Sequence, residues 1–167
     1  MSERLSRFGV GPKIVASVAA GAAMAGLLSH TFSAACAVPA FHHPAVVTLA
    51  VILIMAGLPM YLLGAVAAMK AYNGDQLVDS GVFGLVRHPM YAGWIVLILP
   101  GIALLTASWP FLLMPLIGYV AFKVLIHAED EYLQQRFGRS YSDYRTRVNA
   151  IIPLPRMHHR AAQPQSK

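Results

Sequence analysis

The sequence has few charged residues, and they are unevenly spread. Only 12% of its 167 residues are Asp, Glu, Lys or Arg, about half the ~25% of an average soluble domain. No formal charge occurs between Lys13 and Lys70, and none between Arg87 and Lys123. A soluble core does not need uncharged runs of this length, whereas a transmembrane helix needs about 20 mostly apolar residues. The scarcity of charge therefore argues against a soluble domain and predicts an all-α integral membrane protein.

Cysteine and the common cofactor-binding patterns are also scarce. A single cysteine, Cys36, excludes an intramolecular disulfide and a cysteine-based zinc site. The histidine pairs His42-His43 and His158-His159 are adjacent in sequence, so their side chains point apart and do not form a chelate. The sequence has no glycine-rich phosphate loop and no GxSxG motif. We therefore expect neither a metal site nor a soluble nucleotide-binding fold.

Four apolar stretches predict about four transmembrane helices in one membrane domain, residues 1–155, followed by a disordered tail at 156–167. The first stretch is as long as a membrane span, so we expect it to be retained as an anchor rather than cleaved as a signal peptide. Only Ala107 to Pro110 separate the last two stretches, which predicts a tight antiparallel hairpin. The expected spans are about 14–35, 44–70, 90–107 and 110–127.

Lysine and arginine are confined to certain segments of the chain. The connections near 36–43 and 107–110 contain neither residue. All thirteen lie in the N-terminal segment, in the 70–87 loop, at the inner end of the fourth span or in the C-terminal tail. Because cytoplasmic loops are enriched in these residues, both termini and the 70–87 loop are predicted to be cytoplasmic. The net charge of +6 then reflects topology and does not predict a nucleic-acid partner.

The chain becomes more polar after about residue 128, where cytoplasmic C-terminal helices are predicted over 128–148. Gly138 is a suitable C-cap for the first of them. Ser140 is a suitable N-cap for a second. The second helix would place three side chains on one face: Tyr141, Tyr144 and Val148. Because this segment is amphipathic and basic, we expect it to lie against the membrane surface.

Ionisable residues gather at the membrane boundary, where they are usually functional. One cluster, Arg87 and His88 with Tyr91, begins the third span. A second cluster follows the fourth span and contains His127, Glu129, Asp130 and Glu131. The hairpin must bring the two clusters together, which predicts a site for a zwitterionic or amphiphilic small molecule. Each cluster also has a purely structural explanation, which remains open. Arg87 can anchor the chain at the membrane surface, Pro89 can start a helix, and Glu129 to Glu131 can stabilise a helix N-terminus.

Two motifs carry a family resemblance. The run LVDSGVFGLVRHPMYAGW, a hairpin of about 35 residues, and the run AEDEYLQQRFGRSYSDYRTRV occur in this order. They resemble the isoprenylcysteine carboxyl methyltransferases and their phospholipid methyltransferase relatives over about residues 70–153. The shared features are a glycine-aromatic turn, Arg-His-Pro-x-Tyr-x-Gly, and an acidic pair followed by Phe-Gly-x-x-Tyr-x-x-Tyr. The resemblance implies a membrane-embedded methyltransferase that uses S-adenosyl-L-methionine.

The resemblance also implies which residues form the site. The cofactor-binding residues that it implies are Asp75, Gln76, Leu77, Val78, Phe83, His88, Pro89, Met90, Tyr91 and Glu129. Within this set Glu129 can neutralise the cofactor ammonium, His88 can meet its carboxylate, and the apolar members can cover the adenine. We expect Arg87, His88 and Glu129 to be the catalytic residues.

Two positions depart from the family pattern. Relatives that act on prenylcysteine carry an arginine one helical turn before the first acidic residue, where this chain has Leu125. Phe83 replaces a frequent tyrosine. The resemblance therefore implies methyl transfer to a lipid-like or small amphiphilic acceptor, whose reacting group can be a carboxylate, a thiol or an amine. A membrane-embedded NADPH-dependent reductase related to steroid reductases and a non-enzymatic membrane scaffold are the alternatives.

Overall fold

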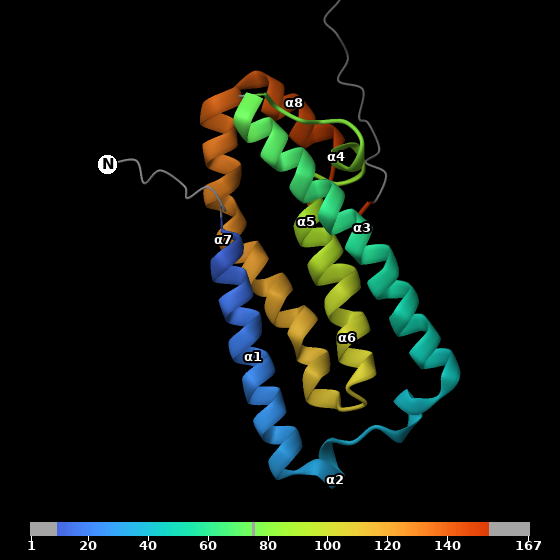
Figure 1. Cartoon of the computed structure of the whole chain (residues 1–167). Coiled ribbons are helices and arrows are strands. Elements are labelled where there is room, and N and C mark those ends of the chain that lie inside the picture. Colours follow the sequence, from blue (N-terminus) through green and yellow to red (C-terminus); the bar gives the residue numbers. More distant parts are fainter. Residues whose placement is uncertain (1–9, 75, 154–167) are drawn as a thin grey trace, which may run out of the picture.

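The protein is a bundle of helices that run roughly along one axis (Figure 1). The computed structural model describes residues 10–74 and 76–153, and the tail predicted to be disordered lies outside them. The long helices are α1 (Gly11–Thr31), α3 (Pro44–Gly74) and α7 (Leu113–Phe137). Between α3 and α7 in the chain lies the third bundle helix, which is built from α5 (Pro89–Tyr91), η2 (Ala92–Ile98) and α6 (Leu99–Leu105). The short elements are α2 (Ser33–Cys36), η1 (Pro39–His42), α4 (Val82–Leu85), η3 (Trp109–Leu112) and α8 (Arg139–Arg147).

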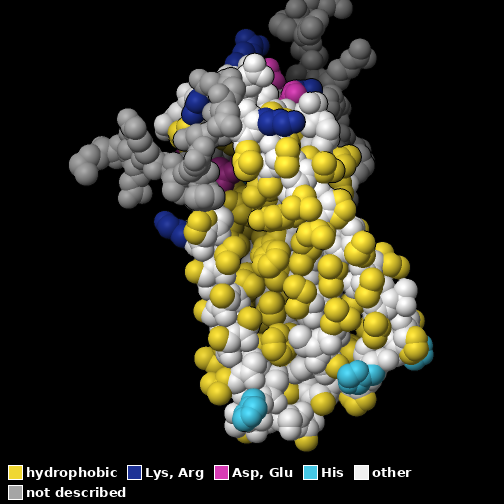
Figure 2. Space-filling view, in the orientation of Figure 1, with side chains coloured by type: hydrophobic (Ala, Val, Ile, Leu, Met, Phe, Trp, Pro, Cys, Tyr) yellow, Lys and Arg dark blue, Asp and Glu magenta, His cyan; other side chains and the backbone are white. Residues whose placement is uncertain are grey.

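The prediction of an all-α membrane protein is confirmed. Among the described residues, three helices are long and apolar enough to cross a membrane, and the helix Pro89–Leu105 is shorter and also apolar. Large apolar side chains face outward along these helices, including Leu27, Met55 and Val124. Figure 2 shows apolar side chains over the long sides of the molecule, with Lys, Arg, Asp and Glu gathered toward one end and His at the other. An outward apolar surface of this kind is suited to lipid.

The third bundle helix packs against α3 at backbone contact distance. A Cβ on Gly93 would lie 2.7 Å from the carbonyl oxygen of Gly57. A Cβ on Gly101 would lie 2.7 Å from the carbonyl oxygen of Ala50. Small residues at helix crossings allow such approaches in membranes, where packing replaces the hydrophobic effect between helices. Between these contacts the helix is π-helical over Ala92–Ile98, a feature that the sequence did not predict.

The predicted hairpin between the last two spans is confirmed. The chain turns through Ala107, which has a left-handed φ of 49°. The turn also binds the connection after α1, because Val38 N–H donates to Ala107 O at 2.8 Å and the Ser29 and Ser108 hydroxyls lie 2.7 Å apart. Leu99 of α6 and Met114 of α7 share one buried cluster. The hairpin therefore sets the two halves of the candidate site side by side at its open end.

Three expectations about the C-terminal part were wrong. No separate helix begins near residue 128, because α7 continues without a break to Phe137. Gly138 ends α7 as predicted, with a φ of 53°, but it also precedes the first residue of α8, so Ser140 is not an N-cap. The tyrosine face of α8 is buried inside the protein, with Tyr141 1% and Tyr144 2% exposed. α8 crosses the end of the bundle (Figure 1) because these phenols have protein partners there, described below.

Candidate functional site

Arg87 and His88 lie at the start of the third bundle helix, where the backbone is still extended. His88 is the N-cap of α5 and Pro89 is its first residue, which agrees with the prediction that the proline starts a helix. Arg87 N–H donates to Asn149 O at 2.7 Å, and His88 N–H donates to Ala150 O at 2.9 Å. The segment after α8 therefore satisfies the backbone donors that precede the helix. It also fixes the direction of both side chains.

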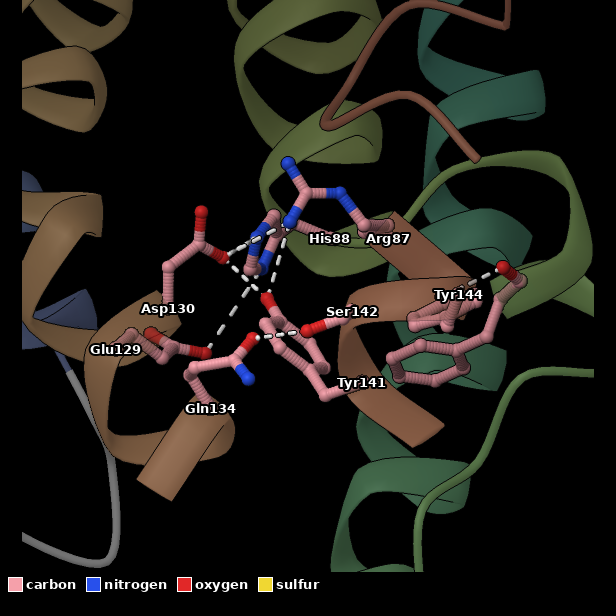
Figure 3. Close-up of polar contacts among 9 residues, drawn as sticks. Arg87, His88, Glu129, Asp130, Gln134, Tyr141, Ser142 and Tyr144 are labelled. Carbon is pink, nitrogen blue, oxygen red and sulfur yellow. Dashed lines mark hydrogen bonds and ion pairs between the residues drawn. The ribbon is translucent and has the colours of Figure 1, made fainter. Parts of the chain in front are cut away.

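The Arg87 side chain points into the protein and meets two groups. Its Nη1 donates to Asp130 Oδ1 at 3.1 Å and to the Tyr141 hydroxyl at 3.0 Å, and Tyr141 in turn donates to the same carboxylate oxygen (Figure 3). The Arg87 and Asp130 side chains are only 6% and 9% exposed. Buried charges persist only when they are paired and hydrogen-bonded. This triangle joins the third bundle helix, α7 and α8 at one point.

The tyrosines of α8 are held as neutral hydrogen-bond donors. Burial raises the pKa of Tyr141 well above its ordinary value, and the adjacent Asp130 carboxylate raises it further. Burial likewise raises the pKa of Tyr144, whose hydroxyl donates to Phe83 O at 2.7 Å. α8 therefore binds both the loop before the third bundle helix and the acidic part of α7.

His88 lies between Glu129 and Asp130 of α7. Its Nδ1 is 3.9 Å from Glu129 Oε1, and its Nε2 is 3.3 Å from Asp130 Oδ1. The Tyr91 hydroxyl donates to the other Glu129 oxygen at 3.2 Å. The Phe122 ring meets the imidazole edge-on, with ring centroids 5.6 Å apart. The structure therefore confirms that the two ionisable clusters meet, through His88, Tyr91 and Glu129.

Two nitrogens of this cluster have no hydrogen-bond partner in the described chain. Arg87 Nε and His88 Nε2 are both buried, and the geometry between His88 Nε2 and Asp130 does not form a hydrogen bond. Buried donors of this kind are rare in folded proteins. The Glu129 side chain stays 24% exposed. The cluster thus has polar atoms with binding capacity left for a ligand.

Other predicted site residues lie outside this group of contacts. Pro89 and Met90 face α3, because a Cβ on Gly64 would lie 3.0 Å from Pro89 Cγ and 3.2 Å from Met90 Cγ. Gln76 is exposed, whereas the half-buried side chains are Leu77, Val78 and Phe83. Asp75 lies outside the described residues. A role of these residues in cofactor binding stays a prediction.

The acidic cluster separates into two parts. Asp130 is buried and Glu129 half-buried, whereas His127 and Glu131 are exposed. The exposed pair lines a pocket of ≈ 240 Å³ between α7 and α8, to which Asp130 also contributes. Sequence reasoning missed Tyr141 as a partner of the buried residues. The signal was present in the spacing Phe-Gly-x-x-Tyr-x-x-Tyr, but amphipathicity suggested a membrane-facing helix.

An apolar groove of ≈ 530 Å³ lies between α1 and α7. Its lining residues are Ser17, Leu116, Ile117, Val120, Ala121, Val124 and Leu125. The Ser17 hydroxyl donates to a backbone carbonyl of its own helix, the one of Lys13, which leaves the groove almost without free polar groups. Leu125 is one helical turn before Glu129 on α7, so the groove approaches the ionisable cluster.

The fold and the site together define a helical membrane protein with a buried, ionisable cluster at the open end of a helical hairpin. The family model for phospholipid methyltransferases matches residues 44–140, which include α3, the hairpin and the whole cluster up to Glu129 and Asp130. The chain belongs to this phospholipid methyltransferase family. No solved structure matches the chain.

Individual relatives match the same region. The chain is 36% identical over 89 residues to protein-S-isoprenylcysteine O-methyltransferase of Schizosaccharomyces pombe, which covers 53% of this chain and 38% of that protein. It is 34% identical over 87 residues to the protein of the same name in Dictyostelium discoideum, and this match covers 46% of this chain and 32% of that protein. The protein of the same name in Tribolium castaneum is 37% identical over 88 residues, a match that covers 47% of this chain and 28% of that protein. The matches thus span well under half of the length of these relatives.

Proposed function

We propose that this protein is an S-adenosyl-L-methionine-dependent membrane methyltransferase that acts on a lipid-like or small amphiphilic acceptor. The observation that carries the proposal is the buried contact of His88 and Tyr91 with Glu129 at the open end of the hairpin. Family membership over residues 44–140 supports the same reaction class. The apolar outer surface and the groove that approaches Glu129 support an acceptor that arrives from the lipid.

The residues present fit the proposed cofactor. Glu129 has an exposed fraction of 24% and can accept a hydrogen bond from an ammonium group. The buried His88 imidazole lies 3.3 Å from Asp130 Oδ1 through Nε2, without the geometry of a hydrogen bond, and we propose that it also meets the carboxylate of the ligand. Leu77, Val78 and Phe83 are half-buried apolar side chains suited to an aromatic base. We propose that these residues hold S-adenosyl-L-methionine.

The chemistry places modest demands on the protein. When bound, the sulfonium supplies a methyl group whose bond to sulfur breaks as the acceptor bond forms, and the sulfur keeps the electron pair. The chain must align the acceptor with that methyl group, since orientation accounts for much of the rate. A carboxylate or thiolate acceptor loses no proton in the transfer. An amine acceptor does, and we propose that Glu129 or His88 receives the proton, because the two lie together in the cluster.

Arg87 has a different proposed role from the one that the sequence suggested. Its Nη1 is fully engaged by Asp130 and Tyr141. We propose that Arg87 acts through Asp130 as a positioning residue, because that carboxylate also lies beside His88 Nε2. The proposed catalytic residues that face the ligand are then His88 and Glu129.

We propose that the site faces the cytoplasm. In the described part of the chain, the connections at the hairpin-turn end contain no Lys or Arg, and the basic side chains gather toward the end that carries α8 (Figure 2). The positive-inside bias assigns the α8 end to the cytoplasm. A soluble cofactor would then enter from water, and the acceptor from the membrane.

Calorimetry on the purified full chain in detergent tests the reaction class. S-adenosylhomocysteine should bind with measurable heat, whereas NADPH should not. Membranes incubated with methyl-labelled S-adenosyl-L-methionine should then yield a labelled lipid-soluble product, whose identity gives the acceptor. A folded protein that binds NADPH and not S-adenosylhomocysteine would overturn the proposal in favour of a reductase.

A further inference from the structure

A tryptophan inside the third bundle helix carries a donor that the described chain does not use. Trp94 lies on η2, and its Nε1 is buried without a hydrogen-bond partner among the described residues. Buried donors are nearly always paired, so each exception calls for a physical explanation. The exception is more severe among lipid tails, because no water is present to accept the hydrogen bond.

Trp94 belongs to the surroundings of the candidate site. Its side chain packs against the same buried cluster as Tyr91 and Leu125, a cluster that includes Phe122. Tyr91 is the residue whose hydroxyl donates to Glu129. Trp94 is three positions after Tyr91, which places the Trp94 backbone about 4–5 Å deeper along the helix. Trp94 therefore lies about one helical turn from Tyr91, on the side of the membrane interior, and packs on the same cluster as that site residue.

The local backbone fixes this tryptophan. Trp94 is inside the π-helical segment Ala92–Ile98, and such segments are rare and occur frequently at functional sites. The preceding Gly93 is pressed against the Gly57 carbonyl of α3. The indole also packs against a second buried cluster, formed by Val18, Leu99 and Met114. The ring is thus anchored on several sides while its one polar atom stays unused.

We propose that Trp94 Nε1–H binds an oxygen atom of the methyl-accepting lipid and so holds the acceptor's polar group beside Tyr91 and Glu129. This inference rests on the proposed function. A neutral donor in apolar surroundings suits a carbonyl, carboxylate or phosphate oxygen at the junction between a polar head and an apolar tail. Leu125, which packs on the same cluster, also lines the α1–α7 groove. Trp94 does not line the groove, so the proposal requires a single-tailed lipid with its tail in the groove to reach Trp94 past Leu125.

Fluorescence tests the contact directly, because the chain has two tryptophans. Trp109 is 47% exposed at the hairpin-turn end, where its Nε1 donates to Ala35 O at 3.3 Å. The Trp109→Phe protein in dodecyl maltoside therefore reports on Trp94 alone. We expect a saturable emission shift to longer wavelength with N-acetyl-S-farnesylcysteine or with lysophosphatidylethanolamine, and none with farnesene, which has a similar tail and no oxygen. The responding probe identifies the source of the oxygen, and no response to either overturns the proposal.

Kinetics give a second readout with the responding probe. Trp94→Phe keeps an aromatic ring and removes the N–H, so it should raise the KM for the acceptor about tenfold, as expected for one lost hydrogen bond. The Kd of S-adenosylhomocysteine should change by less than about twofold, since Trp94 is not among the residues proposed to hold the cofactor. Trp94→His, which restores an N–H, should recover part of the loss, and Trp109→Phe should be neutral. An unchanged KM in a folded Trp94→Phe protein overturns the inference.

The two tests also separate this inference from the proposed function. If the wild-type protein neither binds S-adenosylhomocysteine nor transfers methyl groups, the proposed function fails. A saturable shift of Trp94 emission with an oxygen-bearing lipid would then still assign a lipid-binding site to this residue. If methyl transfer is observed and Trp94 neither shifts nor affects KM, the function stands and the inference fails.

Discussion

Arg87 Nη1 and Asp130 Oδ1 lie 3.1 Å apart in the interior, and both side chains are less than a tenth exposed. The residues are 43 positions apart in the chain, so the contact closes the whole hairpin at its open end. Tyr141 completes the triangle from α8. Charges buried to this extent are stable only together, and removing one partner leaves the other without compensation.

Asp130→Asn should therefore lower the stability of the protein strongly. The amide keeps the shape and can still accept from Tyr141, but it no longer neutralises the buried Arg87. We expect a loss of about 3 kcal/mol in the free energy of unfolding, measured as a lowered thermal midpoint in detergent. Asp79→Asn is a matched control, because Asp79 forms an ion pair with Arg147 at 3.3 Å in which both side chains are about half exposed. This exposed pair should contribute at most about 1 kcal/mol. Equal losses in the two variants would contradict the structural role of the buried pair.

Glu129 is the residue on which cofactor binding depends most in the proposed site. Glu129→Gln retains the side-chain length and the contact with the Tyr91 hydroxyl, but it removes the charge that would meet an ammonium group. The affinity for S-adenosylhomocysteine should fall by about 1–3 kcal/mol, measured by calorimetry. Glu131→Gln, two residues away and exposed, should bind like the wild type. An undiminished affinity in folded Glu129→Gln would remove Glu129 from the cofactor site.

The crossing of α3 with the third bundle helix can be tested at its glycines. A Cβ on Gly93 would lie 2.7 Å from Gly57 O and 2.9 Å from Tyr61 N, both of them backbone atoms that cannot move aside alone. Gly93→Ala should therefore destabilise the protein by about 1–3 kcal/mol. Gly26→Ala on α1 meets its nearest atom only at 4.0 Å and should be neutral or stabilising, because alanine favours helix. Thermal unfolding in detergent compares the two, and a neutral Gly93→Ala would contradict the close crossing.

Much of the architecture could be predicted because membrane helices are constrained by length and charge. The uncharged runs bounded by Lys13, Lys70, Arg87 and Lys123 mark the spans, and the short connection at Ala107 makes the last two antiparallel neighbours. The meeting of His88 with Glu129 follows from that hairpin alone. This part of the site could be predicted because it depends on the order and direction of the membrane helices, which the distribution of apolar residues indicates.

Other features depend on tertiary contacts and could not be predicted. The helix α7 passes from lipid-facing residues to Asp130 without a break because its polar side chains find partners inside the protein, which composition does not indicate. The face of α8 that contains Tyr141 resembles a membrane-facing stripe until its hydroxyl partners are known. The π-helical segment Ala92–Ile98 has no simple sequence signature. Attention falls on Trp94 within it only because the indole N–H is buried without a hydrogen-bond partner among the described residues.

We expect a substitution at Leu125 to change the choice of acceptor. This residue lines the α1–α7 groove and stands one helical turn before Glu129. Leu125→Arg would place a cation there, and the long side chain can keep its apolar stem in the groove. We expect the KM for a carboxylate acceptor, N-acetyl-S-farnesylcysteine, to fall relative to that of lysophosphatidylethanolamine by about tenfold, the ratio for one charge-assisted contact of modest strength. Val124→Arg, at a 68% exposed position that lines the same groove, adds the same charge but not one helical turn before Glu129, and should leave the ratio unchanged. If both variants shift the ratio alike, a general effect of charge explains the change and Leu125 has no special role in acceptor choice.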